Sequence, residues 1–202
     1  MKVGTIAARV HLSIIGALVV VSAWPLLGAA QGDHAHAAAA QQTAEQKAKA
    51  SALVATVRDA TARFQDVAVA EAEGYHLQFG CVSGPDYGAM GLHYVNFALV
   101  TEANQQGVLD PSRPQIVIYE PQPSGRLKLI GADFLVFADA WNAKHASPPE
   151  LMGQLFHLFE SPNRFGLPPF YTLHVWAWKD NPTGTFVNWH SNVSCDAFAG
   201  QQ

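Results

Sequence analysis

Apolar residues recur at steps of three and four through residues 43–73, and this pattern predicts a long helix. Thr43 and Gln46 have the spacing of a capping box at its start, and Gly74 supplies a stop. Unbroken, the helix would be about 45 Å long. The apolar stripe that would face the rest of the domain is Ala50, Leu53, Val57, Ala60, Phe64 and Val67.

After Gly74 the pattern changes to short apolar runs separated by turn-forming residues, which is typical of strands. The third and fourth runs, joined by Pro121–Gly125, predict a hairpin. Ser147, Pro148 and Glu150 have the order of cap, first-turn proline and capping-box acid, and predict a short helix over 147–159. The predicted strands are 75–81, 91–99, 115–120, 126–137 and 171–178.

This order of elements predicts an α+β domain over residues 43–202. In it, a long N-terminal helix packs on a mostly antiparallel sheet of four to five strands, with one short helix added. The length of 202 residues suits one domain.

The pattern of the first 30 residues is typical of an export signal. Lys2 and Arg9 precede an apolar run from Leu12 to Leu27, and small residues follow up to Ala30. The run is shorter than the ~20 residues that span a bilayer, so we expect cleavage rather than a retained anchor. Residues 31–42 then form a flexible linker. No later stretch is long and apolar enough to cross a membrane, so we expect a periplasmic or secreted protein.

Composition narrows the function classes. Hydrophobic residues make up 49% of the chain and charged residues 14%, which is enough apolar material for a core and excludes a highly charged disordered chain. The formal net charge is −4. Binding of nucleic acid through bulk positive charge is therefore not expected.

Export makes the two cysteines informative. Cys81 and Cys195 are the only cysteines, and in an oxidising compartment an even pair usually forms a disulfide. Ligation of a metal by these thiols is the alternative, but no CxxC spacing supports it.

Four ionisable residues interrupt strands whose faces otherwise look buried. His93 shares a face with Val95 and Phe97, and His174 lies in an entirely apolar run. Glu120 shares parity with Ile116 and Ile118. Asp133 shares parity with Leu127, Leu129, Leu135 and Phe137.

A buried charge needs a partner, and one shared site would satisfy all four residues. Two imidazoles with carboxylates suit a divalent metal: zinc, iron or copper. The predicted metal ligands are therefore His93, Glu120, Asp133 and His174. Each also has a simpler explanation. Glu120 can pair with Arg126 across the hairpin, Asp133 can cap a bulge at Gly131, and a core histidine can bond a backbone carbonyl.

Aromatic residues near these positions predict a ligand pocket as an alternative function. In that hypothesis the protein is a non-catalytic binding module, and a small apolar molecule sits among the aromatic side chains. A third hypothesis is a structural envelope protein whose polar core residues only pair with each other. The candidate pocket residues are Tyr94, Tyr171, Trp176 and Trp178, with His157 and His76 at the rim.

Several motifs resemble a group of uncharacterised exported bacterial proteins. The shared patterns are MGxHYVN at 90–96, YE at 119–120, LHVWxW at 173–178, NPxGxF at 181–186 and a terminal cysteine. The chain departs from the group at 131–134, where Gly-Ala-Asp-Phe stands in place of a motif ending Glu-Tyr, so its carboxylate is shorter. The resemblance implies export and the same candidate residues, and implies no reaction.

Overall fold

The computed structural model describes residues 42–84 and 86–199. The predicted signal peptide and nearly all of the predicted linker lie outside this range. The elements, in chain order, are α1 (Ala44–Thr61), the 3-10 helix η1 (Ala62–Gln65), α2 (Val67–Ala72), β1 (His76–Gly84), β2 (Gly88–Val95), α3 (Phe97–Gln106), β3 (Ile116–Pro121), β4 (Leu127–Phe137), α4 (Ala138–Asn142), β5 (Glu150–Leu151), β6 (Gln154–Leu155), β7 (His157–Phe159) and β8 (Phe170–Val175).

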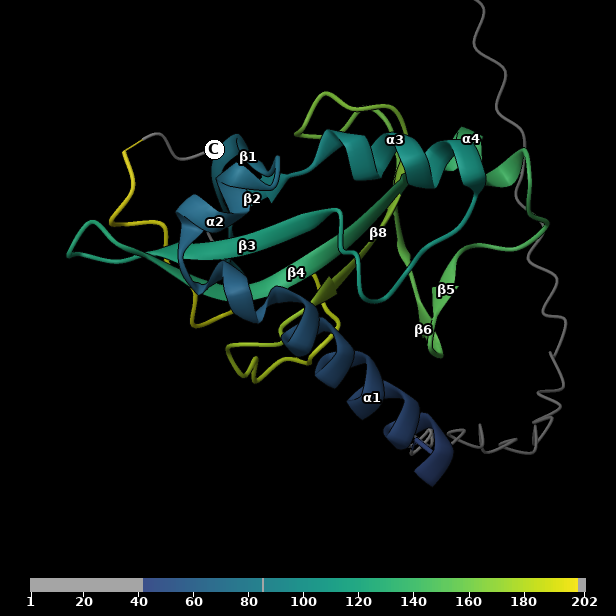
Figure 1. Cartoon of the computed structure of the whole chain (residues 1–202), viewed down its shortest axis with the longest axis horizontal. Coiled ribbons are helices and arrows are strands. Elements are labelled where there is room, and N and C mark those ends of the chain that lie inside the picture. Colours follow the sequence, from purple (N-terminus) through teal and green to yellow (C-terminus); the bar gives the residue numbers. More distant parts are fainter. Residues whose placement is uncertain (1–41, 85, 200–202) are drawn as a thin grey trace, which may run out of the picture. The chain divides into compact units, whose positions relative to one another are not determined.

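The predicted α+β class is confirmed, and the sheet is larger than expected. Six strands pair in the order β1-β2-β3-β4-β8-β7, and every pairing is antiparallel. In Figure 1, β3 and β4 run side by side through the middle of the domain, with α1 in front of them. The predicted hairpin of the third and fourth strands is β3–β4.

The long predicted helix is interrupted. Thr43 and Gln46 form the expected capping box, but α1 ends at Thr61 and a 3-10 turn follows. Asp66 then caps α2 with a hydrogen bond from the Ala68 backbone. A side chain that bonds the local backbone in this way favours a new helix start over continuation of the old one.

Two helices were not predicted, and one predicted helix was wrong. The strand expected over 91–99 ends at Val95 because Asn96 caps α3 by accepting from the Leu99 backbone. Helix α4 directly follows β4. The segment 147–159 instead forms β5, β6 and β7. Met152 and Gly153 have φ of +49° and +83°, and two positive values suit the tight hairpin between β5 and β6.

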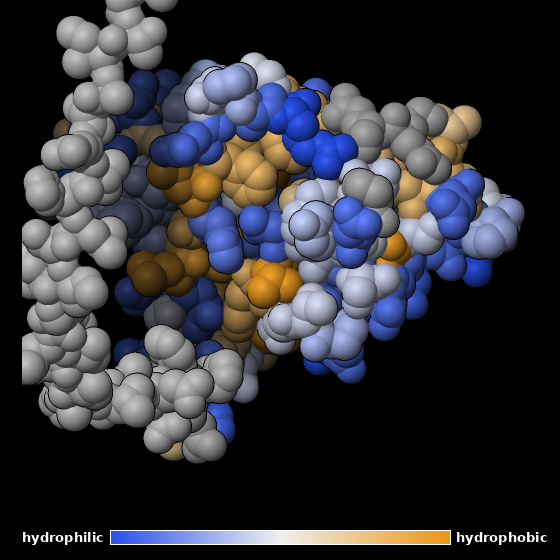
Figure 2. Space-filling model, turned by 180° about the vertical axis from the view of Figure 1, so that it is seen from behind, coloured by the Kyte–Doolittle hydropathy of each residue, from blue (hydrophilic) through white to orange (hydrophobic). Residues whose placement is uncertain are grey.

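The two faces of the sheet are covered by different parts of the chain. One face packs against the N-terminal helices: Leu53 and Val57 of α1 join Phe134 and Leu173 in one core cluster. The opposite face carries His93, Asp133 and His174 and lines a cavity with residues of α3. Seen from behind, hydrophobic residues also reach the surface in patches between polar ones (Figure 2).

The predicted disulfide is confirmed. Cys81 and Cys195 are bonded, and the bridge closes a sequence separation of 114 residues. Among the described residues, no helix has both the length and the apolar character required to cross a membrane.

Candidate metal centre

Three of the four predicted ligands meet in space. His93 lies on β2, Asp133 on β4 and His174 on β8, and all three are buried. One donor atom from each residue lies within 4.8 Å of the others, which makes this a group that can hold a metal ion. Asp133 and His174 face each other directly in the β4–β8 ladder.

Sheet curvature brings the two histidines together. Strands β2 and β8 are separated by β3 and β4. On a flat sheet they would lie about 14 Å apart, since neighbouring strands are spaced by about 4.8 Å. The Nε2 atoms of His93 and His174 are only 3.3 Å apart. The sheet therefore curls, and the two imidazoles converge on its concave face.

The hydrogen bonds of His93 define its protonation. Its Nδ1 lies 3.2 Å from the carbonyl oxygen of Gly91. A carbonyl only accepts, so the neutral ring carries its proton on Nδ1 and its lone pair on Nε2. That lone pair points toward His174.

His174 has two possible tautomers with different consequences. Its Nδ1 is buried without a hydrogen-bond partner among the described residues and lies 3.7 Å from Asp133 Oδ1. With the proton on Nε2, His174 donates to His93 and turns a lone pair toward the carboxylate, which is unfavourable. With the proton on Nδ1, the N–H faces the carboxylate and two Nε2 lone pairs converge. Histidine ligands of metals have this second arrangement, with the other nitrogen directed to a carbonyl or carboxylate.

The spacing of the nitrogens also fits an ion. Two ligands of a tetrahedral ion at about 2.0–2.1 Å lie about 3.3 Å from each other. The observed separation of the two Nε2 atoms is 3.3 Å. The nitrogens therefore already have the spacing of two zinc ligands.

Burial shifts the pKa of each of the three residues in the direction that favours its neutral form. Burial lowers the pKa of His93 to about 4, with a further lowering by His174. Burial likewise lowers the pKa of His174 to about 3. Burial raises the pKa of Asp133 to about 6, against the opposing effect of the Thr172 hydrogen bond. Neutral imidazoles are the form that binds metals.

Thr172 bonds a residue of the candidate metal centre, and the sequence analysis did not include it. Its hydroxyl lies 2.6 Å and 2.7 Å from the two carboxylate oxygens of Asp133 and donates to them. Thr172 is two residues before His174 on β8, so the period of two along a strand places both on one face. That spacing was the signal available in the sequence.

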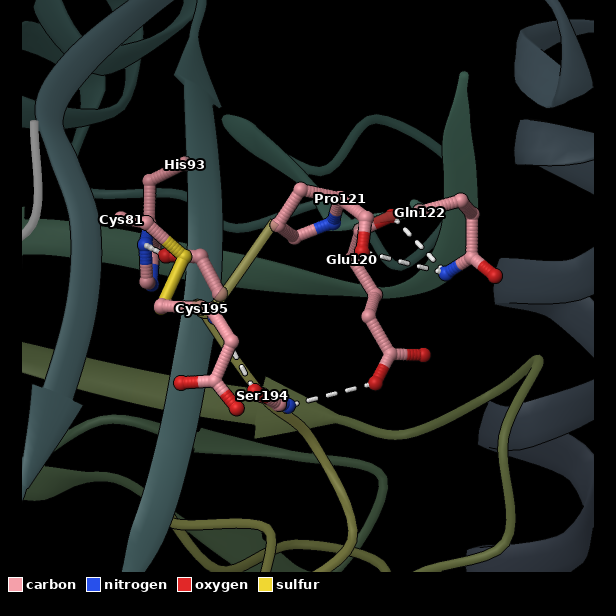
Figure 3. The surroundings of a disulfide bond; sticks show 9 residues. Cys81, His93, Glu120, Pro121, Gln122, Ser194 and Cys195 are labelled. Carbon is pink, nitrogen blue, oxygen red and sulfur yellow. Dashed lines mark hydrogen bonds between the residues drawn. A yellow bond between two sulfur atoms is a disulfide. The ribbon is translucent and has the colours of Figure 1, made fainter. Parts of the chain in front are cut away.

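Glu120 does not belong to this group. Its carboxylate accepts from Lys179 Nζ at 2.7 Å and 2.8 Å and from the Ser194 backbone at 3.3 Å. Figure 3 shows this carboxylate bonded to Ser194, beside the disulfide of Cys195. Glu120 is four residues along β3 from Ile116, the partner of Asp133, a distance of about 13 Å. The expected alternative pairing with Arg126 is replaced by the pairing with Lys179.

The residues predicted for an aromatic pocket are dispersed. Tyr94 packs edge-on against Tyr119, whose hydroxyl donates to Phe64 on the helix-covered face. Tyr171 belongs to the cluster beneath α1. Trp178 donates to Thr61 at the end of α1, and Trp176 donates to the Val187 carbonyl. Trp176 does remain near the candidate metal centre, because its ring lies 5.7 Å from that of His174.

The two predicted rim histidines lie at the surface. His157 is exposed on β7 and lies within 3.3 Å of the Phe186 carbonyl through Nε2. His76 is the exposed first residue of β1. Neither lines the cavity next to the candidate metal centre.

The cavity beside the candidate metal centre is lined by other residues. Its polar side chains are those of His93, Asp133, Thr172 and His174, and its other walls are apolar. The apolar lining is Phe79, Met90, Val95, Phe97, Val100, Ile116, Leu135, Phe137, Phe159, Phe165, Leu167 and Phe170. An aromatic-walled cavity thus exists, built from phenylalanines that the sequence analysis did not single out.

A further buried histidine lies near the group. His190 is fully buried, and its Nδ1 accepts from the Asn192 backbone. Its ring lies edge-on to that of Trp176, with centroids 4.9 Å apart. Trp176 therefore lies in contact with the rings of both His174 and His190.

Comparisons with models of known families, with curated proteins and with solved structures found no match for this chain. The motif resemblance to exported bacterial proteins stays a prediction, and the functional argument depends on the geometry described above.

Proposed function

We propose that this protein is exported and binds a divalent metal ion through His93, Asp133 and His174. The observation that carries the proposal is the convergence of two Nε2 atoms at 3.3 Å while each Nδ1 faces an oxygen. Without a cation, that arrangement either brings two lone pairs together or leaves a buried nitrogen beside a carboxylate. A metal ion satisfies all three residues at once.

The donor set suits both zinc and iron(II). Two histidines and one carboxylate form a three-ligand zinc site with a position left for water. The same set with open positions suits non-haem iron(II). In either case the remaining positions would face the apolar cavity, because all three residues line it. Asp133 would either coordinate the ion or orient His174, and Thr172 would fix its carboxylate.

The disulfide supports a periplasmic or secreted location. Cys81–Cys195 links the edge strand β1 to the C-terminal segment of the domain. Disulfides of this kind persist in oxidising compartments and are rare in the cytosol. The apolar run of residues 12–27 supplies the export signal that such a location requires.

Elemental analysis of protein purified without a histidine tag tests the metal directly. We expect close to one equivalent of zinc or iron, or stoichiometric uptake when the metal-free protein is titrated with each ion. His93→Ala and His174→Ala should each lower affinity at least 100-fold. Circular dichroism would verify that each variant is folded.

Two controls make the result specific to the three residues. His145→Ala removes a histidine that stacks on Trp141 and bonds the Gly107 carbonyl, outside the group. Glu120→Gln removes the fourth predicted ligand, which pairs with Lys179 instead. Both should keep full metal binding. Folded wild-type protein that takes up none of these ions would refute the proposal, and a co-purifying organic molecule without metal would favour the binding-module alternative.

A further inference from the structure

The cavity beside the candidate metal centre has a polar floor and an aromatic rim. His93, Asp133 and His174 are buried at its floor. Phe79, Phe159 and Phe165 are only partly buried, and Phe97 is 54% exposed. The cavity therefore extends from the three ionisable residues to the surface near the start of α3.

Phe79 is held at the rim by an unusual backbone conformation. In the β1–β2 ladder, Gln78 pairs with His93 and Cys81 with Leu92, so Phe79 and Gly80 form a bulge opposite the histidine. Phe79 has φ of +64°, in the left-handed region that a bulky residue rarely adopts. Such outliers persist where the surrounding structure enforces them, and bulges beside sites redirect side chains. Here the bulge turns a phenylalanine into the cavity.

A second segment completes the rim from the opposite side. Phe165 contacts Phe79 with ring centroids 5.3 Å apart. Asn163 fixes this loop: its side chain accepts from the backbones of Phe165 and Leu167 and donates to the Leu167 carbonyl. Phe165 and Leu167 both line the cavity. Two independent backbone features thus aim apolar side chains at one opening.

The size of the cavity limits its occupant. Its volume is about 60 Å³. An apolar cavity of about 150 Å³ holds benzene, which has six heavy atoms. A space of 60 Å³ therefore suits two or three heavy atoms, and its apolar walls exclude charge.

We propose that this cavity binds an uncharged molecule of two or three heavy atoms, the class to which dioxygen belongs, next to the metal held by His93, Asp133 and His174. The contact with the metal rests on the proposed function. Occupancy of the cavity does not, because its walls and its volume are present in the chain itself. The phenylalanine rim would admit small apolar molecules and exclude larger or charged ones.

Xenon tests the cavity in metal-free protein. Under xenon pressure, methyl resonances of Val95, Val100 and Ile116 should shift and saturate. Those of Leu53 and Val57, on the helix-covered face, should not. Absence of saturable shifts at the cavity methyls, or equal shifts on both faces, would overturn the proposal.

Matched substitutions distinguish a loss of xenon binding caused by filling the cavity from one caused by enlarging any buried side chain. Val100→Leu adds one methylene inside the cavity and should weaken xenon binding at least fivefold. Val117→Leu adds the same group to a buried position outside the lining and should leave it unchanged. Phe79→Gly removes the rim ring and the unfavourable φ together. It should therefore admit benzene without the loss of stability that a buried truncation usually brings, and an unchanged ligand size limit would count against the role given to Phe79.

Nitric oxide, an uncharged diatomic probe, tests the contact with the metal. Added to iron(II)-loaded protein, it should give the spectrum of an iron–nitrosyl complex, and Val100→Leu should weaken this binding without changing iron stoichiometry. Iron binding with neither xenon nor nitric oxide uptake would refute the cavity proposal and leave the proposed function intact. Xenon uptake without any metal binding would refute the proposed function and the placement of the ligand at a metal.

Discussion

Two buried carboxylates on neighbouring strands have opposite surroundings. Glu120, at the end of β3, receives two hydrogen bonds from Lys179 and one from the Ser194 backbone. Asp133, in the middle of β4, receives its side-chain hydrogen bonds from the neutral hydroxyl of Thr172 and faces two imidazoles. The first carboxylate has its countercharge within the chain. The second has only neutral partners.

The difference distinguishes a structural carboxylate from a candidate ligand. A buried ionised group needs a partner of opposite charge, or it changes its protonation state. Lys179 meets that need at Glu120, whereas at Asp133 the pKa rises to about 6 because of burial. Burial alone could not have separated the two, since both are buried. The presence of a cationic partner at Glu120 and its absence among the described side chains that bond Asp133 distinguish the two carboxylates.

The largest effect should come from the disulfide beside the Glu120 region. Replacing both Cys81 and Cys195 by serine removes a cross-link over 114 residues, which should lower the free energy of unfolding by about 4–5 kcal/mol. Guanidinium denaturation would measure the loss. The metal affinity of the protein that remains folded should be unchanged. A loss of metal binding in the folded variant would show that the Asp133 region depends on the disulfide beside Glu120.

Removing the countercharge of Glu120 should have the next largest effect. Lys179→Met leaves a buried carboxylate without its cation and should lower stability by about 3 kcal/mol. Combining it with Glu120→Gln should recover much of the loss, because the unpaired charge disappears. A double variant no more stable than Lys179→Met, measured by urea denaturation, would show that Lys179 acts through other contacts.

The Asp133 region should control how stability depends on pH in the metal-free protein. His93 and His174 have lowered pKa values, so the unfolded chain binds more protons between about pH 4 and 6.5, and stability rises with pH there. Asp133 has a raised pKa, so the folded state binds more protons between about pH 4 and 6, which opposes that rise. The two histidines outweigh the one carboxyl group.

Asp133→Asn should therefore steepen the pH dependence. Each unmatched proton changes stability by about 1.4 kcal/mol per pH unit, so the contribution of the cluster between pH 4 and 6 should roughly double. Denaturation midpoints in the presence of a chelator, measured from pH 4 to 6.5, would show this. Glu120→Gln is the matched control, and a shallower curve for Asp133→Asn would contradict the assigned pKa shifts.

The smallest effect should come from Thr172. Thr172→Val keeps the shape of the side chain and removes the hydroxyl that bonds Asp133, at a loss of about 1 kcal/mol of stability. Metal affinity should fall about tenfold, as for other residues that orient a ligand. Thr172→Ser, which keeps the hydroxyl, should retain affinity in a metal titration, and equal losses in both variants would assign the effect to packing.

The strand pattern predicted His93, Asp133 and His174 of the candidate site, and a bulge explains one of its errors. Parity correctly placed Asp133 on the face of Leu135 and Phe137, which line the cavity with it. It was wrong about Leu129. Ile130 is an extra residue of β4 between the partners of Ile118 and Tyr119, so side chains before this bulge lie on the face opposite to the one that a regular period of two predicts. Parity put Glu120 on the correct face but carried no information about position along the strand.

The helices show the same limit of local patterns. The capping box at Thr43 was predicted because its two partners are three residues apart and the structure is local. The end of α1 and the turn at Met152–Gly153 were not predicted. In both segments the sequence carries a helical pattern, and the backbone conformation that interrupts it has no clear signal of its own. The aromatic pocket failed for another reason, because curvature of the sheet, and not strand sequence, decides which rings share a cavity.

The distance between the imidazoles of His93 and His174 depends on the curvature of the sheet. Gly131 lies opposite Ile118 in the β3–β4 ladder, and an added Cβ there would come within 2.7 Å of the Val175 carbonyl. A side chain at this position would push β4 and β8 apart without replacing any of the three proposed ligands. Because His174 lies on β8, that displacement would move its imidazole away from His93, so a substitution at a residue outside the site should weaken metal binding.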